Sequence, residues 1–210
     1  MKTLILSIVF GGLVLLSACK KETELKKTIF IPDENFSDLP EYSEWGYNAF
    51  GAYYDRELFV SNNSKVPAKI VNTGGKTTFT LKGQLGAYEY YYSYRHYYFD
   101  KYPVMTMTFE VNNFSPQTYS DLINLDKTTI DLTESPSAVS VMIDTAKYGV
   151  KILSGTFEFK RAQNLIVDKS PIEVILSGTF EFQALFGGEP ISVSLGRFDV
   201  GIGPDNFFKY

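Results

Sequence analysis

The sequence ILSGTFEF occurs twice in this chain, at residues 152–159 and again at residues 175–182. A looser third copy, LGRFDV, follows at residues 195–200. In the middle copy, apolar residues alternate with polar residues, which is the period of a β-strand with one buried face. In the first and third copies the apolar residues change parity around Gly155 and Gly196, as they do across a β-bulge. The repeat therefore predicts three successive strands of an antiparallel meander, with bulges near these two glycines.

The two-residue period extends through most of the chain beyond Trp45. Apolar residues occupy alternate positions in segments 104–111 and 139–143, and residues 77–81 have the composition of a further short strand. Clusters of Gly, Pro, Asn and Asp separate such segments at short intervals. This spacing is typical of antiparallel sandwiches and barrels.

Only residues 116–124 have helical features. Ser115 suits the N-cap position and Pro116 the first position of a helix. We therefore expect a single all-β domain over residues 45–210, built as an antiparallel β-sandwich or a meander barrel with one short helix. The sequence leaves these two architectures open.

The overall composition limits the classes of protein to which the chain can belong. Its 210 residues are 44% hydrophobic and 21% charged, which excludes a disordered chain, a collagen-like repeat and a polytopic membrane protein. The formal net charge of −4 argues against a nucleic-acid-binding protein, because no basic excess is present to displace counterions from phosphates. One Cys and one His exclude an internal disulfide and a His-rich metal site, so we expect no metal and no cofactor.

The first nineteen residues have the features of an export signal. Lys2 gives a positively charged start, and residues 4–16 form an apolar stretch that is too short to span a bilayer as a helix. The sequence LSAC at residues 16–19 resembles a bacterial lipobox, in which the peptide before the cysteine is removed and the thiol carries a lipid. We therefore expect residues 1–18 to be a lipoprotein signal peptide and Cys19 to anchor the protein in the cell envelope, at the outer membrane. The alternative is an ordinary secretory signal with an unrelated cysteine.

The segment after Cys19 shows little hydrophobic periodicity. Five acidic residues and no basic residue occur over residues 33–44, together with Pro40. Such a composition is typical of a solvated linker. Residues 19–44 are therefore predicted to be the acylated N-terminus followed by a flexible tether.

Two parts of the chain resemble small, uncharacterised lipoproteins of the Bacteroidota. In these proteins an SGTF-type strand precedes a GRFDV-type strand, as residues 154–159 and 196–200 do here, and an N-terminal hairpin begins with Gly-Ala, as in residues 50–59. The resemblance implies an all-β exported domain and carries no assigned chemistry. This chain has Asp55-Arg56 where Asn-Gly would favour a tight hairpin, so we expect a longer or distorted loop there.

The chain offers little for catalysis. His96 is the only histidine and no nucleophile motif accompanies it, so we interpret it as a packed or surface residue. Residues 73–77 imitate the end of a phosphate loop but lack its first glycine, and we interpret them as a turn. Glu158, Glu181 and Asp199 share one position of the repeat, and their parity next to core-facing Phe predicts a solvated sheet face. We therefore predict a protein without catalytic activity.

Eight of the 15 tyrosines lie between residues 88 and 102. If this segment were a strand, its alternate positions would form an almost continuous aromatic stripe. Tyr combines an apolar ring with a polar hydroxyl, which suits stacking against sugar rings and half-wet protein surfaces. The alternative is that these rings pack across the sheet or into the core. The candidate ligand-binding residues are Tyr88, Tyr90, Tyr92, Tyr94, Arg95 and Tyr98.

Together these features predict a lipid-anchored, non-catalytic binding or accessory module that presents a Tyr-rich face to a glycan or an envelope partner protein. The alternative is a structural envelope lipoprotein without a small-molecule ligand. In both cases the chain meets a membrane through its N-terminal lipid and does not bind nucleic acid.

Overall fold

The computed structural model describes residues 28–61, 67–86, 102–135 and 138–210 of the chain. Within these residues the protein is all-β with one short 3-10 helix, η2, as the sequence predicts. The elements are β1 (Ala49–Tyr54), β2 (Glu57–Ser61), β3 (Ala68–Thr73), β4 (Lys76–Leu85), β5 (Val104–Val111), η2 (Tyr119–Leu125), β6 (Thr128–Asp131), β7 (Val139–Ile143), β8 (Ala146–Tyr148), β9 (Val150–Val167), β10 (Ser170–Phe186), β11 (Glu189–Ile202) and β12 (Phe207–Lys209).

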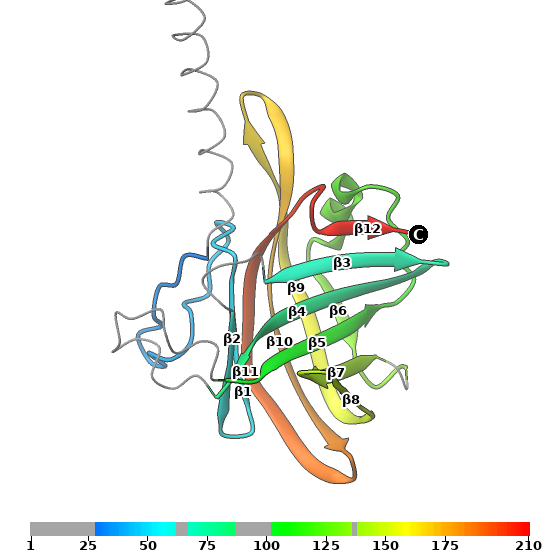
Figure 1. Ribbon diagram of the computed structural model, residues 1–210. Helices are drawn as coiled ribbons and strands as arrows, with labels where there is room; N and C mark the ends of the chain where they lie inside the picture. Colours follow the sequence, from blue (N-terminus) through cyan, green and yellow to red (C-terminus); the bar gives the residue numbers. More distant parts are fainter. Residues whose placement is uncertain (1–27, 62–66, 87–101, 136–137) are drawn as a thin grey trace, which may run out of the picture.

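The strands belong to one large, strongly curved sheet (Figure 1). The order along the sheet is β6-β9-β10-β11-β1-β2-β4-β5-β7-β8, with antiparallel pairing throughout this path. β3 pairs with the start of β4 while β2 pairs with its end, and the C-terminal β12 adds to β3 in parallel. Among the described strands, the end strands β6 and β8 do not pair with each other, so the sheet is not closed into a barrel. Of the two predicted architectures, the structure therefore favours the sandwich-like one.

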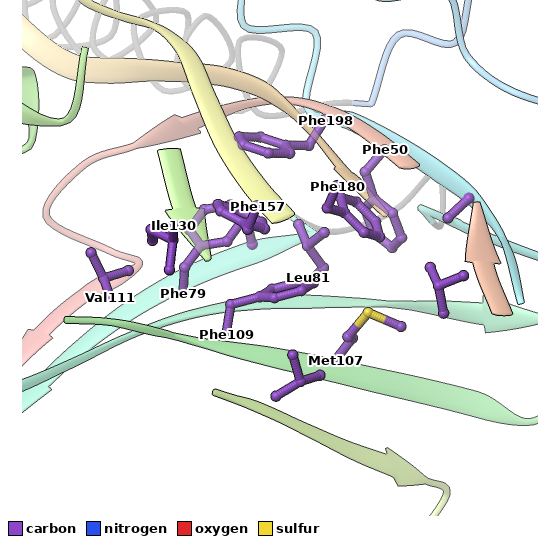
Figure 2. Packing of buried hydrophobic residues seen from close by; sticks show 14 of the residues in the cluster. Phe50, Phe79, Leu81, Met107, Phe109, Val111, Ile130, Phe157, Phe180 and Phe198 are labelled. Carbon is purple, nitrogen blue, oxygen red and sulfur yellow. The ribbon is translucent and has the colours of Figure 1, made fainter. Parts of the chain in front are cut away.

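The curved sheet has two halves that face each other, one containing β9, β10 and β11 and the other containing β4 and β5. A cluster of phenylalanine rings fills the space between them (Figure 2). Phe157 of β9 lies within it, with its ring centroid 4.4 Å from that of Phe109 on β5 and 5.4 Å from that of Phe79 on β4. Its ring also stacks on Phe198 of β11 at a centroid distance of 5.1 Å. All four side chains are fully buried or nearly so, and burial of each one stabilises the fold by roughly 1.5–3 kcal/mol. The Phe positions of the repeat therefore hold the two halves together.

The glycines of the repeat make room for these rings. Gly178 of β10 lies opposite Phe198 of β11, and a Cβ atom at Gly178 would lie 2.6 Å from the Cζ atom of that ring. In the same way Gly196 lies opposite Phe180, and a Cβ atom there would lie 2.6 Å from the ring's Cδ2 atom. Each ring thus covers a glycine on the neighbouring strand, which explains why Gly and Phe recur together in the sequence.

The two predicted bulges are present. Between β10 and β11 the pairing passes from Phe180–Gly196 to Phe182–Val193, so β11 contains one extra residue at this point. Leu195 within the bulge has a φ of 53° and turns its side chain outward. Between β9 and β10 a similar shift lies beside Leu153, which is exposed, two residues before Gly155. The parity changes in the sequence therefore correspond to real changes in which face the side chains occupy.

The helix differs from its prediction in where it begins. η2 starts at Tyr119 with Thr118 as its N-cap, and not at Pro116 with Ser115 as N-cap. The carboxylate of Asp121 accepts hydrogen bonds from the backbone N–H groups of Gln117 and Thr118, at 2.7 and 2.9 Å. Asp121, at the third helical position, therefore accepts from the N-cap residue and the residue before it, as the third residue of a capping box does.

The hairpin between β1 and β2 also differs from its prediction. Tyr54 pairs directly with Glu57, so Asp55 and Arg56 form a tight two-residue turn and not a longer loop. Asp55 adopts a φ of 53°, a left-handed conformation that Asp tolerates better than most residues. Hydrogen bonds of 2.7 Å in both directions between Asp55 and the backbone of Ser192 on β11 stabilise this conformation. The contact with Ser192 therefore stabilises a tight turn that, from local sequence alone, would be expected of Asn-Gly.

The expected tether is wrong over residues 28–44. Residues 28–47, here called the strap, cross the outer face of the sheet and pack on it. Leu39 is completely buried, Asp33 forms an ion pair with Arg197 at 2.5 Å, and Lys160 lies 5.4 Å from the ring centroid of Tyr42. Side chains of the folded domain thus bind a segment whose composition alone resembles a linker. Residues 19–27 lie outside the described residues.

Candidate functional site

The structure places the two ends of the Tyr-rich segment next to each other. β4 and β5 pair up to Gln84 and Val104, and the N–H of Leu85 donates to the carbonyl of Pro103 at 3.1 Å. Residues 87–101 lie outside the described residues, and with them all the predicted ligand-binding residues and the only histidine, which are Tyr88, Tyr90, Tyr92, Tyr94, Arg95, His96 and Tyr98. Cys19 lies outside them as well. The geometry therefore fixes where the Tyr-rich segment leaves and rejoins the sheet.

A second hydrophobic cluster lies beside this point, on the outer side of the sheet. Leu39 of the strap, Leu58 and Val60 form its buried part, and the rings of Tyr53 and Tyr102 pack against them. We call these five residues the outer cluster. Phe36 of the strap meets Tyr53 edge to face, with ring centroids 6.4 Å apart. The last tyrosine of the Tyr-rich segment is thus part of an aromatic surface that the strap helps to build.

Sequence reasoning missed the outer cluster for a physical reason. Leu39 lies in an acidic segment with proline and no apolar period, so nothing in the local pattern predicts its burial. Val60 and Leu58 flank Phe59, whose ring faces the main core. β2 is buried on both faces and therefore lacks the polar–apolar alternation by which a strand is recognised in a sequence.

Asp199 fastens the strap to the sheet. Its carboxylate is buried, at 3% exposure of the residue, and accepts hydrogen bonds from the backbone N–H groups of Trp45, Gly46 and Tyr47 at 3.1, 2.8 and 3.1 Å. The hydroxyl groups of Ser43 and Ser177 also donate to it. Each of the two carboxylate oxygens has several donors, so the charge is fully solvated by the protein. The arrangement resembles an anion site that the protein's own side chain already fills.

The predicted solvated position is therefore wrong for Asp199, although Glu181 at the same repeat position is exposed and Glu158 is half-buried. The sequence contains one small signal of this difference, the change from Glu to Asp in the third copy. The shorter side chain keeps the carboxylate close to the sheet, where the backbone of the strap can reach it.

Arg197 provides a second fastening point, two residues earlier on β11. Its guanidinium donates to the carboxylate of Asp33 at 2.5 Å and to the carbonyl of Pro40 at 3.4 Å. Partial burial opposes the charge of Asp33, but hydrogen bonds from the N–H groups of Asn35 and Phe36, with the nearby Arg197, lower the pKa of Asp33 below its ordinary value. Asp33 is therefore ionised at neutral pH and paired.

One surface hollow contains a carboxylate whose pKa is shifted. Hydrogen bonds from the backbone and hydroxyl of Thr133 lower the pKa of Asp131, which lines a surface hollow of about 450 Å³ between η2 and β6. A carboxyl with a lowered pKa is a poor proton donor at neutral pH. The residues 73–77 form the turn between β3 and β4, as predicted. Within the described ranges, no group of three or more His, Cys, Asp and Glu side chains could hold a metal ion.

Two further observations concern membrane-spanning helices and similarity to known proteins. In the part of the chain that the structure describes, no helix has the length and apolar character needed to cross a membrane. No protein-family model, curated protein or solved structure matches this chain.

Proposed function

We propose that this protein is an exported, lipid-anchored, non-catalytic binding or accessory module whose Tyr-rich segment contacts a glycan or a partner protein of the cell envelope. The observation that carries the proposal is the position of the segment's two ends, which meet beside the outer cluster. The segment with eight tyrosines, of which Tyr102 is the last, thus begins and ends at a surface to which Tyr53 also contributes its ring. Aromatic rings with polar tips suit contacts with sugars and with protein surfaces.

The proposed lipid anchor rests on the sequence LSAC at residues 16–19. Thr28, where the described strap begins, lies only nine positions after Cys19 in the sequence. A chain of this length spans at most about 30 Å. An acylated Cys19 would therefore hold the domain close to the membrane surface, at the outer membrane.

The binding part of the proposal is tested with the triple variant Tyr90→Ala, Tyr92→Ala, Tyr94→Ala. Binding to a panel of polysaccharides and to envelope extracts is measured by calorimetry, with Tyr210→Ala as control, because Tyr210 is 78% exposed at the C-terminus. We expect the triple variant to lose binding and keep its free energy of unfolding, while the control keeps both. A triple variant that unfolds more easily and binds as before would show that these rings are core, and would support a structural envelope lipoprotein instead.

The anchor is tested separately with Cys19→Ser. We expect this variant to leave the membrane fraction while the unmodified protein stays in it. If the Ser variant still sediments with membranes and the native protein carries no lipid at Cys19, the lipid anchor is wrong.

A further inference from the structure

The only tryptophan of the chain is held at the surface. Trp45 is 73% exposed, although its backbone N–H is bound to the buried carboxylate of Asp199. The next two N–H groups, of Gly46 and Tyr47, bind the same carboxylate. The backbone of this turn is therefore held in place, while the indole ring lies outside the hydrophobic core. An exposed Trp on a fixed backbone points to a partner for the ring.

Other exposed apolar side chains lie around this turn. The N–H of Ile29 donates to the carbonyl of Tyr47 at 2.7 Å, and the side chain of Ile29 is 50% exposed. On the other side, Gln163 of β9 donates to the carbonyl of Glu44, directly before Trp45.

Gln163 lies near the end of β9, where the β9–β10 hairpin projects beyond the rest of the sheet (Figure 1). This end of the hairpin exposes Ile166 at 62% and Val167 at 39%. We call Ile29, Trp45, Ile166 and Val167 the apolar rim. Val167 projects from the same face of β9 as Gln163 and Ile166 from the opposite face, so the tip of the hairpin is apolar on both faces.

The path of the chain indicates what covers the apolar rim. Cys19 lies nine positions before Thr28, the residue that precedes Ile29. An acylated Cys19 therefore keeps this edge of the domain within about 30 Å of the bilayer. Tryptophan is enriched at membrane–water interfaces, where its apolar ring and its polar N–H both find suitable surroundings. Branched aliphatic side chains beside it add apolar area that enters the same layer.

We infer that the apolar rim docks on the lipid bilayer, so that the anchored domain lies against the membrane with Trp45 in the headgroup region. This inference rests on the lipid anchor of the proposed function and deepens it, because it assigns the face that meets the membrane.

The single tryptophan makes the test direct. The full chain, exported and purified in detergent, is reconstituted into phosphatidylcholine vesicles with either ordinary or brominated acyl chains. Bromine quenches tryptophan fluorescence only at short range. We expect the emission of Trp45 to shift to shorter wavelength on reconstitution and to be quenched in the brominated vesicles.

Variants separate docking from anchoring. Ile166→Ser is expected to lose the blue shift and most of the quenching. Leu153→Ser is the matched control, because Leu153 is also exposed, at 50%, on the same strand but roughly 40 Å further along it. A protein that floats with the vesicles but shows equal emission with both lipids keeps its anchor and overturns the docking. A Cys19→Ser protein that still floats and is quenched supports docking, and it refutes the anchor if the native protein also carries no lipid at Cys19. A native chain that does not float overturns both.

One more outcome concerns the kind of partner. If Trp45 emission responds to a soluble polysaccharide and not to the brominated lipid, the apolar rim belongs to a glycan site and the membrane docking is refuted.

Discussion

Replacing Asp199 by Ala should release the strap and destabilise the whole domain. The substitution removes the acceptor for three backbone N–H groups of the strap and for the hydroxyl groups of Ser43 and Ser177. A hydrogen bond to a charged group contributes about 1.5–3 kcal/mol, but five bonds to one carboxylate are not additive. The strap can also move away and let water reach its N–H groups, which limits the loss. We therefore expect the free energy of unfolding to fall by about 3–6 kcal/mol.

The measurement is urea unfolding of the unlipidated chain from Lys20 to Tyr210, followed by circular dichroism. Fluorescence anisotropy of Trp45 gives a second, local readout, because the ring lies in the released turn and should move more freely before the sheet unfolds. Glu181→Ala is the matched control, since Glu181 occupies the same repeat position but is exposed, and it should change the stability by less than about 0.5 kcal/mol. If Asp199→Ala were no worse than this control and left the anisotropy unchanged, the carboxylate would not be what fastens the strap.

Three further predictions address other parts of the structure. The pKa of Asp33 is lowered in the fold, so its pair with Arg197 stabilises the protein above the ordinary pKa of 3.8, and this stabilisation is lost as the pH falls through the lowered pKa. The free energy of unfolding should therefore drop less between about pH 6 and about pH 3 in Arg197→Ala than in the native protein. An equal drop in both proteins would contradict this prediction. Gly178→Ala should lower the free energy of unfolding in urea by at least about 3 kcal/mol, because its Cβ would lie 1.9 Å from the Glu158 carbonyl oxygen. Gly149→Ala should leave it unchanged, because no atom lies within 4 Å of a Cβ there. Similar values for both variants would refute the predicted steric clash at Gly178. Phe157→Ala should lower the unfolding free energy by about 3–5 kcal/mol in the same assay, and a loss below 1 kcal/mol would mean that the ring cluster does not hold the two halves together.

The fold was predictable where strands alternate between buried and exposed positions, as β5 does. Residues 104–111 form β5 with Met105, Met107 and Phe109 fully buried, as their alternate positions predict. Even the bulges were visible, since a bulge shifts parity in the sequence as it does in space. The choice between sandwich and barrel was not predictable, because it depends on whether β6 and β8 meet, and short strands carry no information about distant edges.

The strap and its fastening points show where local pattern fails. Asp33 and Leu39 look like parts of a solvated linker until Arg197 and the β2 side chains are brought to them by folding. Asp199 looks like one more outward acid of a repeat until the strap covers it. The contact of Asp33 with Arg197 joins residues 164 positions apart, and the contact of Gly46 with Asp199 joins residues 153 positions apart. No sequence window spans such a distance.

The same long separations impose an order on folding. β1 obtains its neighbour β11, and β3 its neighbour β12, only when the last residues of the chain are available, although both early strands are synthesised long before. Contacts between distant segments are slow to form, because a large loop must close before they are gained. The unpaired edges of the early strands are therefore open to aggregation while the chain is incomplete. A truncation of even the three residues of β12 would leave the edge of β3 permanently in that vulnerable condition.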